Sequence, residues 1–151
     1  MDRFEKAILT NMCMVYDGNG NVLVQDRVDA EWGGITFPGG HVEKEEDFAD
    51  AVIREVYEET GLRISHPKLC GVKQWLEDDG SRYIVFCYKT DCYEGSLVSS
   101  NEGEMKWVSL DELPNLPLAS GMTYMLKLFL DENVSEHCFR KENGEWIDVL
   151  K

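Results

Sequence analysis

The chain has 151 residues, with 29 acidic against 15 basic side chains and a formal net charge of −14. This length is typical of one domain, so we expect residues 1–151 to form a single domain with its own hydrophobic core. The acidic balance argues against long nucleic acid and anionic membranes as partners, because both are bound through local positive charge. A small phosphorylated ligand stays compatible, provided that a divalent cation screens the carboxylates.

The cysteines indicate a reducing compartment. There are five, they are scattered along the chain, and none forms a Cys-x-x-Cys pair. We therefore expect neither a zinc site nor a disulfide framework. Met1 is followed by charged residues, and no apolar run approaches the length of a membrane-spanning helix. Together these observations predict a cytoplasmic protein.

The first quarter of the chain predicts a β-hairpin followed by irregular segments. Residues 7–16 are rich in β-compatible side chains, and the Asp17-Gly18-Asn19-Gly20 turn separates them from a strand at 22–24. Residues 26–35 predict a polar loop. Residues 36–40 predict a second irregular stretch, in which Pro38 fixes its own φ and the paired glycines permit unusual backbone conformations.

A helix is predicted next, over residues 47–60, with Gly61 at the position of a C-terminal glycine cap. Its expected buried arc consists of Phe48, Ala49, Val52, Ile53 and Val56.

The second half of the chain predicts more strands than helices. The predicted elements are strands at 69–75 and 83–90 around an Asp78-Asp79-Gly80 turn, a strand at 105–108, a helical turn at 109–113 stopped by Pro114, a helix at 121–130, and a hairpin centred on Asn143-Gly144. Strands and helices alternate too loosely for a doubly wound parallel sheet. We expect an α/β fold of the α+β kind, with a mixed sheet covered by helices.

The most informative segment is Gly40–Leu62, GHVEKEEDFADAVIREVYEETGL. On a helix, Glu55, Glu58 and Glu59 fall within one sector of about 100°, because they are spaced i, i+3 and i+4. Like charges at this spacing repel each other and destabilise an isolated helix by roughly 0.2–0.5 kcal/mol per pair. A helix face with this charge pattern indicates a cation as its partner.

This segment resembles the Nudix box of the Nudix hydrolases, the MutT-like family, and we place the box at residues 40–62. The match covers every defining position: Gly40, Glu46, Arg54, Glu55, Val56, Glu58, Glu59, Gly61 and Leu62. The Phe-Pro-Gly-Gly entry before the box and the Glu102–Trp107 segment after it extend the resemblance over most of the chain. The resemblance implies an α/β/α sandwich with a mixed sheet and a catalytic loop–helix–loop.

The resemblance also implies a magnesium site, with manganese as a substitute, since both ions prefer oxygen ligands. The implied metal ligands are the carboxylates of Glu55, Glu58 and Glu59 and a backbone carbonyl of Gly39 or Gly40. Arg54 is implied to orient the neighbouring glutamates, the alternative being a surface ion pair. Glu55 or Glu102 is implied as the base, and a solvated acidic loop is the alternative for Glu102 and Glu104. Glu46 is interpreted as a structural cap near the helix start.

Substrate contacts are expected from three residues in particular. Arg27 aligns with a phosphate-contacting arginine of MutT-like enzymes, and Phe37 is a candidate for stacking on a base. Ser120 stands where the MutT prototype has an asparagine that reads an oxidised purine. Other aromatic candidates for stacking are Trp32, Trp75, Tyr83 and Trp107, although aromatics in strands are more often core residues. The three histidines show no ligand spacing and are read as ordinary polar residues.

The expected function is Mg²⁺-dependent hydrolysis of a nucleoside triphosphate, similar to 8-oxo-dGTP, to a monophosphate and pyrophosphate. ADP-ribose and dinucleoside polyphosphates are alternative substrates of the same family. ADP-ribose is disfavoured because the only proline between Gly61 and Gly80 is Pro67, which lies too close to the box. Dinucleoside polyphosphates are disfavoured because no tyrosine occurs after the box until Tyr83. A non-catalytic nucleotide-binding Nudix module is the alternative from another class, and a homodimer is one option for the assembly.

Overall fold

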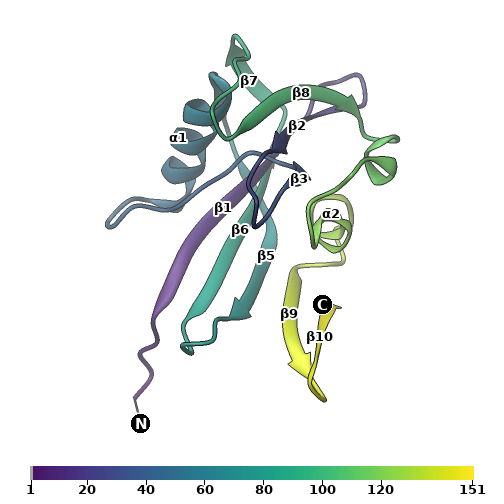
Figure 1. Cartoon of the computed structure of the whole chain (residues 1–151). Helices are drawn as coiled ribbons and strands as arrows, with labels where there is room; N and C mark the ends of the chain where they lie inside the picture. The colour runs from purple at the N-terminus through teal and green to yellow at the C-terminus, as the bar shows by residue number, and fades with distance from the viewer. Residues whose placement is uncertain (1) are drawn as a thin grey trace.

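A five-stranded mixed sheet runs through the middle of the computed structural model, which describes residues 2–151 (Figure 1). The strand order is β1-β6-β5-β9-β10. The strands are β1 (Ala7–Val15), β5 (Lys68–Leu76), β6 (Arg82–Thr90), β9 (Glu136–Glu142) and β10 (Glu145–Leu150). The β1–β6 and β5–β9 pairs are parallel, whereas β5–β6 and β9–β10 are antiparallel. The predicted mixed sheet is therefore confirmed.

Two smaller sheets complete the β-structure. One has the order β3-β2-β8, formed by β2 (Asn21–Arg27), β3 (Gly34–Thr36) and β8 (Gly103–Ser109). The other pairs β4 (Leu62–Ser65) with β7 (Cys92–Gly95), two strands that the sequence pattern did not predict.

The predicted hairpin between β1 and β2 is wrong. The turn forms, because the Asp17 carboxylate accepts hydrogen bonds from the backbone N–H groups of Asn19 and Asn21. Beyond one isolated bridge between Tyr16 and Val22, however, β1 pairs with β6, and β2 pairs with β3 and β8. Because β2 and β3 take up both ends of the predicted 26–35 loop, only residues 28–33 remain outside strands.

Helix α1 (Phe48–Thr60) and helix α2 (Met122–Leu130) lie on opposite sides of the large sheet, which gives the predicted α/β/α sandwich (Figure 1). Gly61 ends α1 with φ 81°, in the left-handed region that favours glycine. The predicted apolar arc is wrong at its start, because Phe48 and Ala49 are exposed and Ala51 is buried instead.

Two further turn predictions have different outcomes. The predicted helical turn before Pro114 is displaced to the 3₁₀ helix Leu113–Asn115, which includes Pro114, because proline is tolerated in a first helical turn. The predicted C-terminal hairpin is confirmed, since Asn143 and Gly144 both have positive φ, as a two-residue hairpin turn requires.

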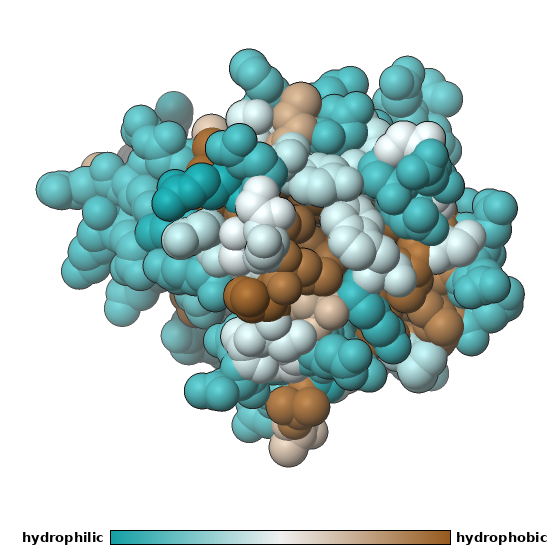
Figure 2. Space-filling view, turned by 90° about the horizontal axis from the view of Figure 1, so that it is seen from above, coloured by the Kyte–Doolittle hydropathy of each residue, from teal (hydrophilic) through white to brown (hydrophobic). Residues whose placement is uncertain are grey.

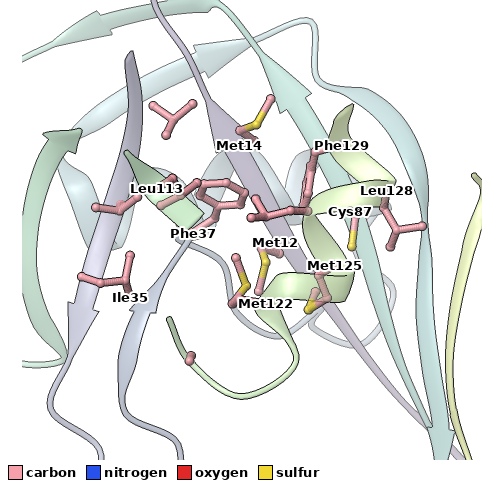
Figure 3. Packing of buried hydrophobic residues seen from close by; sticks show 14 of the residues in the cluster. Met12, Met14, Ile35, Phe37, Cys87, Leu113, Met122, Met125, Leu128 and Phe129 are labelled. Carbon is pink, nitrogen blue, oxygen red and sulfur yellow. The ribbon is translucent and has the colours of Figure 1, made fainter. Parts of the chain in front are cut away.

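Buried side chains form one cluster on each face of β1. Met12 and Met14 face the cluster that contains α2, whereas Cys13 and Val15 face the cluster that contains α1. Because successive residues of a strand point to opposite faces, the second half of β1, which is buried on both sides, is apolar from Met12 to Val15. Figure 3 shows the α2 cluster, in which methionines of β1 and α2 surround Phe37 and Phe129.

The outer surface carries most of the charge. In the view from above, hydrophilic residues occupy the periphery and apolar residues gather toward the middle of the face (Figure 2). All five cysteines are free thiols, in agreement with the prediction that none is paired. Within residues 2–151, no helix combines the length and apolar character needed to cross a lipid bilayer.

Candidate active site

A cavity of about 820 Å³ opens between the large sheet, α1 and the start of α2. This volume lies in the range of pockets that hold nucleotide-sized ligands. One end is lined by the box residues and the other by aromatic and apolar side chains. The lining includes Asn11, Arg27, Trp32, Phe37, Gly39, Gly40, Glu55, Glu58, Glu59, Lys73, Trp75, Tyr83, Glu102 and Ser120.

The paired glycines fasten the loop before α1 to strand β1. The Gly40 N–H donates to Asn11 Oδ1 at 3.0 Å, and the Asn11 N–H donates to the Gly40 carbonyl at 2.8 Å. Neither Gly39 nor Gly40 has a positive φ, so the expectation of unusual backbone conformations is wrong. Glycine is needed for space instead. A Cβ at Gly39 would lie 2.1 Å from the Asn11 carbonyl oxygen, and one at Gly40 would lie 2.2 Å from the Glu55 carboxylate.

Arg54 holds the carboxylates of the box together. Its Nε and one terminal nitrogen donate to both oxygens of Glu46 at 2.8 and 3.0 Å. Its other terminal nitrogen donates to Glu55 at 3.0 Å and to Glu58 at 3.2 Å, and the His41 carbonyl accepts a further bond. A guanidinium that uses its fork in this way fixes the geometry of its partners, unlike a single exposed ion pair.

Glu46 has a different role from the predicted one. It accepts the Glu43 N–H and not a first-turn N–H of α1, and Asp47 occupies the N-cap position. The hydrogen bonds from Arg54 are the main reason why the pKa of Glu46 falls to about 2. Glu46 is therefore the carboxylate that anchors Arg54 from outside the helix.

The remaining carboxylates differ in burial. Glu58 is 55% exposed, Glu55 is largely buried, and Glu59 is only 6% exposed. Burial raises the pKa of Glu55, against the opposing effect of Arg54. Burial, followed by a hydrogen bond to Glu102, raises the pKa of Glu59 to about 8, while the Gly39 N–H, which donates at 3.1 Å, opposes this rise. The cluster thus carries more negative charge than its protein surroundings neutralise.

Glu102 comes from a different part of the chain and meets α1 across the cavity. It lies in the turn before β8, lines the cavity together with Glu59, and contributes to the raised pKa of Glu59. Glu104 instead belongs to β8, opposite Asp26, and does not line the cavity. The structure therefore brings Glu102, and not Glu104, to the box glutamates.

The three predicted substrate residues all line the cavity, in different ways. Arg27 lies 5.5 Å from the centre of the Trp32 ring, and its buried Nε has no partner within residues 2–151. Phe37 is 2% exposed and packs edge-on against Phe129 at 5.1 Å, so its ring belongs mainly to the core. Ser120 is exposed, and its carbonyl accepts the Trp32 indole N–H at 3.0 Å.

Sequence reasoning missed four polar lining residues, Thr10, Asn11, Glu31 and Lys73. Asn11 and Lys73 stand in apolar strands, so their polarity at those positions was the available signal. His41 lines the cavity beside the box, although it was read as an ordinary polar residue. Trp107 does not line it and instead packs against Tyr93 at 5.3 Å.

With this geometry in hand, comparison with known proteins gives the family. The model of the NUDIX domain matches residues 8–129, which include the whole box. The chain belongs to the Nudix family, and its class is that of the Nudix hydrolases.

Relatives in sequence and structure agree with this assignment. The uncharacterized Nudix hydrolase YvcI of Bacillus subtilis is 39% identical over 98 residues, a match that spans 62% of each chain, and thus less than two thirds of YvcI. The phosphatase NudJ of Escherichia coli is 23% identical over 113 residues, or 72% of each chain. The MutT protein of Bacillus halodurans superposes with a TM-score of 0.78 and 28% identity, over 95% of this chain and 97% of that one.

Proposed function

We propose that residues 1–151 form a single Nudix domain that hydrolyses a nucleoside triphosphate, with an oxidised base such as that of 8-oxo-dGTP, to the monophosphate and pyrophosphate. The observation that carries the proposal is the carboxylate cluster held by Arg54 at one end of a nucleotide-sized cavity. The intact box supports turnover over mere binding.

The residues present fit a magnesium or manganese ion. The glutamates and the glycine carbonyls offer the oxygen ligands that these ions prefer, and burial, together with the nearby carboxyl of Glu102, raises the pKa of Glu59. In residues 2–151, no group of three acidic, histidine or cysteine side chains is already arranged around a common point, and Arg54 holds Glu55 and Glu58. We propose Glu55, Glu58, Glu59 and a glycine carbonyl as the ligands.

Of the two glycine carbonyls, that of Gly39 is the better ligand. The Gly40 carbonyl already accepts the Asn11 N–H, whereas the Gly39 carbonyl accepts no hydrogen bond within residues 2–151. When bound, the divalent ion supplies neutralisation of phosphate charge and acidification of the attacking water.

The chain's own residues would then act as follows. Glu55 or Glu102 accepts the proton of the attacking water, since both line the cavity beside the cluster. Water bonds to phosphorus as the bridge between the α- and β-phosphates breaks, and pyrophosphate leaves. Arg54 acts as a positioning residue. Arg27 supplies a cation for the phosphates, because its Nε lacks a partner within the described chain and its side chain lines the cavity.

ADP-ribose is the main alternative substrate, and a similar fold is compatible with it. The Nudix domain of Shewanella oneidensis NrtR, solved with ADP-ribose, superposes with a TM-score of 0.67, but at 16% identity it shows the likeness of fold alone. The cavity volume admits either ligand, so substrate choice rests on direct measurement.

The test is a product assay with Mg²⁺ and a panel of canonical and oxidised nucleoside triphosphates, ADP-ribose and diadenosine polyphosphates. We expect 8-oxo-dGTP to give its monophosphate and pyrophosphate with the highest kcat/KM. Glu55→Gln should abolish turnover while leaving nucleotide binding measurable. Preferred hydrolysis of ADP-ribose would refute the proposed substrate. A folded protein that hydrolyses no member of the panel would refute the proposed catalytic activity and favour a binding module.

A further inference from the structure

Lys73 is a cation at the end of the cavity away from the carboxylates. It lies on β5, with Val85 of β6 and His137 of β9 as its register partners, and its side chain lines the cavity. Its Nζ reaches the start of α2, since a Cβ added at Gly121 would lie 2.7 Å from it. The ammonium is thus held beside the loop that includes Ser120.

The ammonium lacks a partner. Among residues 2–151, Lys73 forms no ion pair and donates no hydrogen bond from Nζ. Lys89 on the adjacent strand, by contrast, donates to the Phe129 carbonyl at 3.4 Å. Asp148 is the charged group with the largest electrostatic effect on Lys73. Its carboxylate, however, is already hydrogen-bonded to His137 Nε2 at 2.6 Å. Burial lowers the pKa of Lys73.

Flat aromatic side chains lie next to this ammonium. Trp75 and Tyr83 stack with their ring centres 4.4 Å apart and their planes within 13°, and both line the cavity. Nζ of Lys73 lies 5.3 Å from the centre of the Trp75 ring. Aromatic walls beside an ammonium favour a flat heteroaromatic ring that carries a hydrogen-bond acceptor on its edge.

The two ends of the cavity have opposite charge. The main charged neighbours of Glu55 are Arg54, Glu58 and Glu102, and those of Glu59 are Glu102 and Glu55. The main charged neighbour of Lys73 is instead Asp148. The phosphates and their metal belong at the glutamate end, because only that end offers hard oxygen ligands. The base of the same nucleotide therefore points toward Lys73.

We propose that Lys73 selects nucleotides by donating a hydrogen bond from its ammonium to a keto oxygen on the edge of the base, an inference that rests on the proposed function. An ammonium offers three donors and no acceptor, so it binds a keto group and gains nothing from an exocyclic amino group. A 6-keto purine thus fits the cavity and a 6-amino purine is disfavoured. An oxidised guanine, with keto groups at positions 6 and 8, belongs to the favoured class.

The test compares dITP with dATP, which differ at the 6-keto or 6-amino edge of the purine. We expect the wild-type protein with Mg²⁺ to favour dITP in kcat/KM by about 10- to 100-fold, the range for a hydrogen bond to a charged group. Lys73→Met, which keeps the apolar stem, should remove this preference by slowing dITP alone. Lys68→Met, at an exposed position of the same strand, should keep it.

Three outcomes overturn the proposal. One is a wild-type protein without a preference for dITP, which needs no variant to observe. Another is an equal loss on both substrates in Lys73→Met, which would assign the lysine to a phosphate or the sugar. The third is an unchanged preference in Lys73→Met, or in Lys73→Gln should the methionine variant fail to fold.

A binding measurement separates this proposal from the proposed function. Trp32 and Trp75 line the cavity, so the intrinsic fluorescence of the protein reports nucleotide binding without turnover. If dITP, dATP and 8-oxo-dGTP all remain unhydrolysed, the proposed function fails, and titration with IMP and AMP still tests Lys73. Tighter binding of IMP that is lost in Lys73→Met supports the selection of a keto group, and equal binding of both nucleotides overturns it.

Discussion

Replacing Gly40 by alanine should damage the chemistry and spare the fold. The new Cβ would lie 2.2 Å from the Glu55 carboxylate, well inside the limit of 3.0 Å that real Cβ contacts respect. The carboxylate must therefore move by about 0.8 Å or more, and it can, because it is the end of a flexible side chain. A displacement of about 1 Å at a reacting group can cost about 100-fold in rate, or about 2.7 kcal/mol of transition-state stabilisation.

The stability of Gly40→Ala should change little. Gly40 has an ordinary φ, so alanine is not strained there and restricts the unfolded chain, a gain of about 0.4–1 kcal/mol that offsets the local adjustment. We would measure kcat/KM by pyrophosphate release and the free energy of unfolding in urea. A variant with wild-type kcat/KM, or one that loses more than about 2 kcal/mol of stability, would refute the reasoning.

Two matched variants sharpen this experiment. In Gly39→Ala the Cβ would meet the backbone of Asn11 at 2.1 Å, and a backbone cannot swing away, so we expect a loss of about 1–3 kcal/mol in stability as well as activity. In Gly18→Ala the Cβ would enter open space, so kcat/KM should not change and stability should rise by no more than about 1 kcal/mol. The opposite pattern, with Gly39→Ala more stable than Gly40→Ala, would contradict the assignment of the two contacts.

Three further predictions follow from the same geometry. A lysine cannot form the two parallel hydrogen bonds that Arg54 donates to Glu46, so Arg54→Lys should lower kcat about 10- to 100-fold with little change in KM. An unchanged kcat would show that Arg54 forms only a surface ion pair. The raised pKa keeps Glu59 largely protonated below about pH 8, so Mg²⁺ binding at pH 7 should release a proton and become tighter as the pH rises. Calorimetry in buffers of different ionisation enthalpy would detect the released proton. Glu59→Gln should abolish this release. Phe129→Ala should cost about 3–5 kcal/mol in urea unfolding, because this ring is buried against Phe37, whereas Leu130→Ala, half-exposed on the same helix, should cost under about 1 kcal/mol.

Several features could be predicted because their signals are local. The spacing of Glu55, Glu58 and Glu59 puts them on one face of a helix wherever that helix lies, and α1 has the predicted extent to within one residue. Gly61 and the Asn143-Gly144 turn adopt positive φ, as their residue types favour. These conformations depend on neighbours a few residues away, which the sequence displays directly.

Other features depended on contacts between distant segments. The Asp17–Gly20 turn was recognisable, but the partners of β1 and β2 were not, because strand pairing is decided by burial on both faces and not by the turn. The sequence likewise did not reveal why glycine is required at residues 39 and 40. Their φ values are ordinary, and only the approach of β1 and Glu55 leaves no room for a Cβ.

Periodicity and spacing act within one element, so they were enough to predict the class of the fold and the helix face that carries the glutamates. Which residues share the cavity could be read from the three-dimensional arrangement alone. It brought Glu102 to Glu59 across 43 positions of the numbering, excluded Trp107, and placed Lys73 beside Trp75 with no partner in the described chain. The physical reason is that a cavity is lined by side chains from separate strands, loops and helices, whose distances are set by the packing of the whole chain.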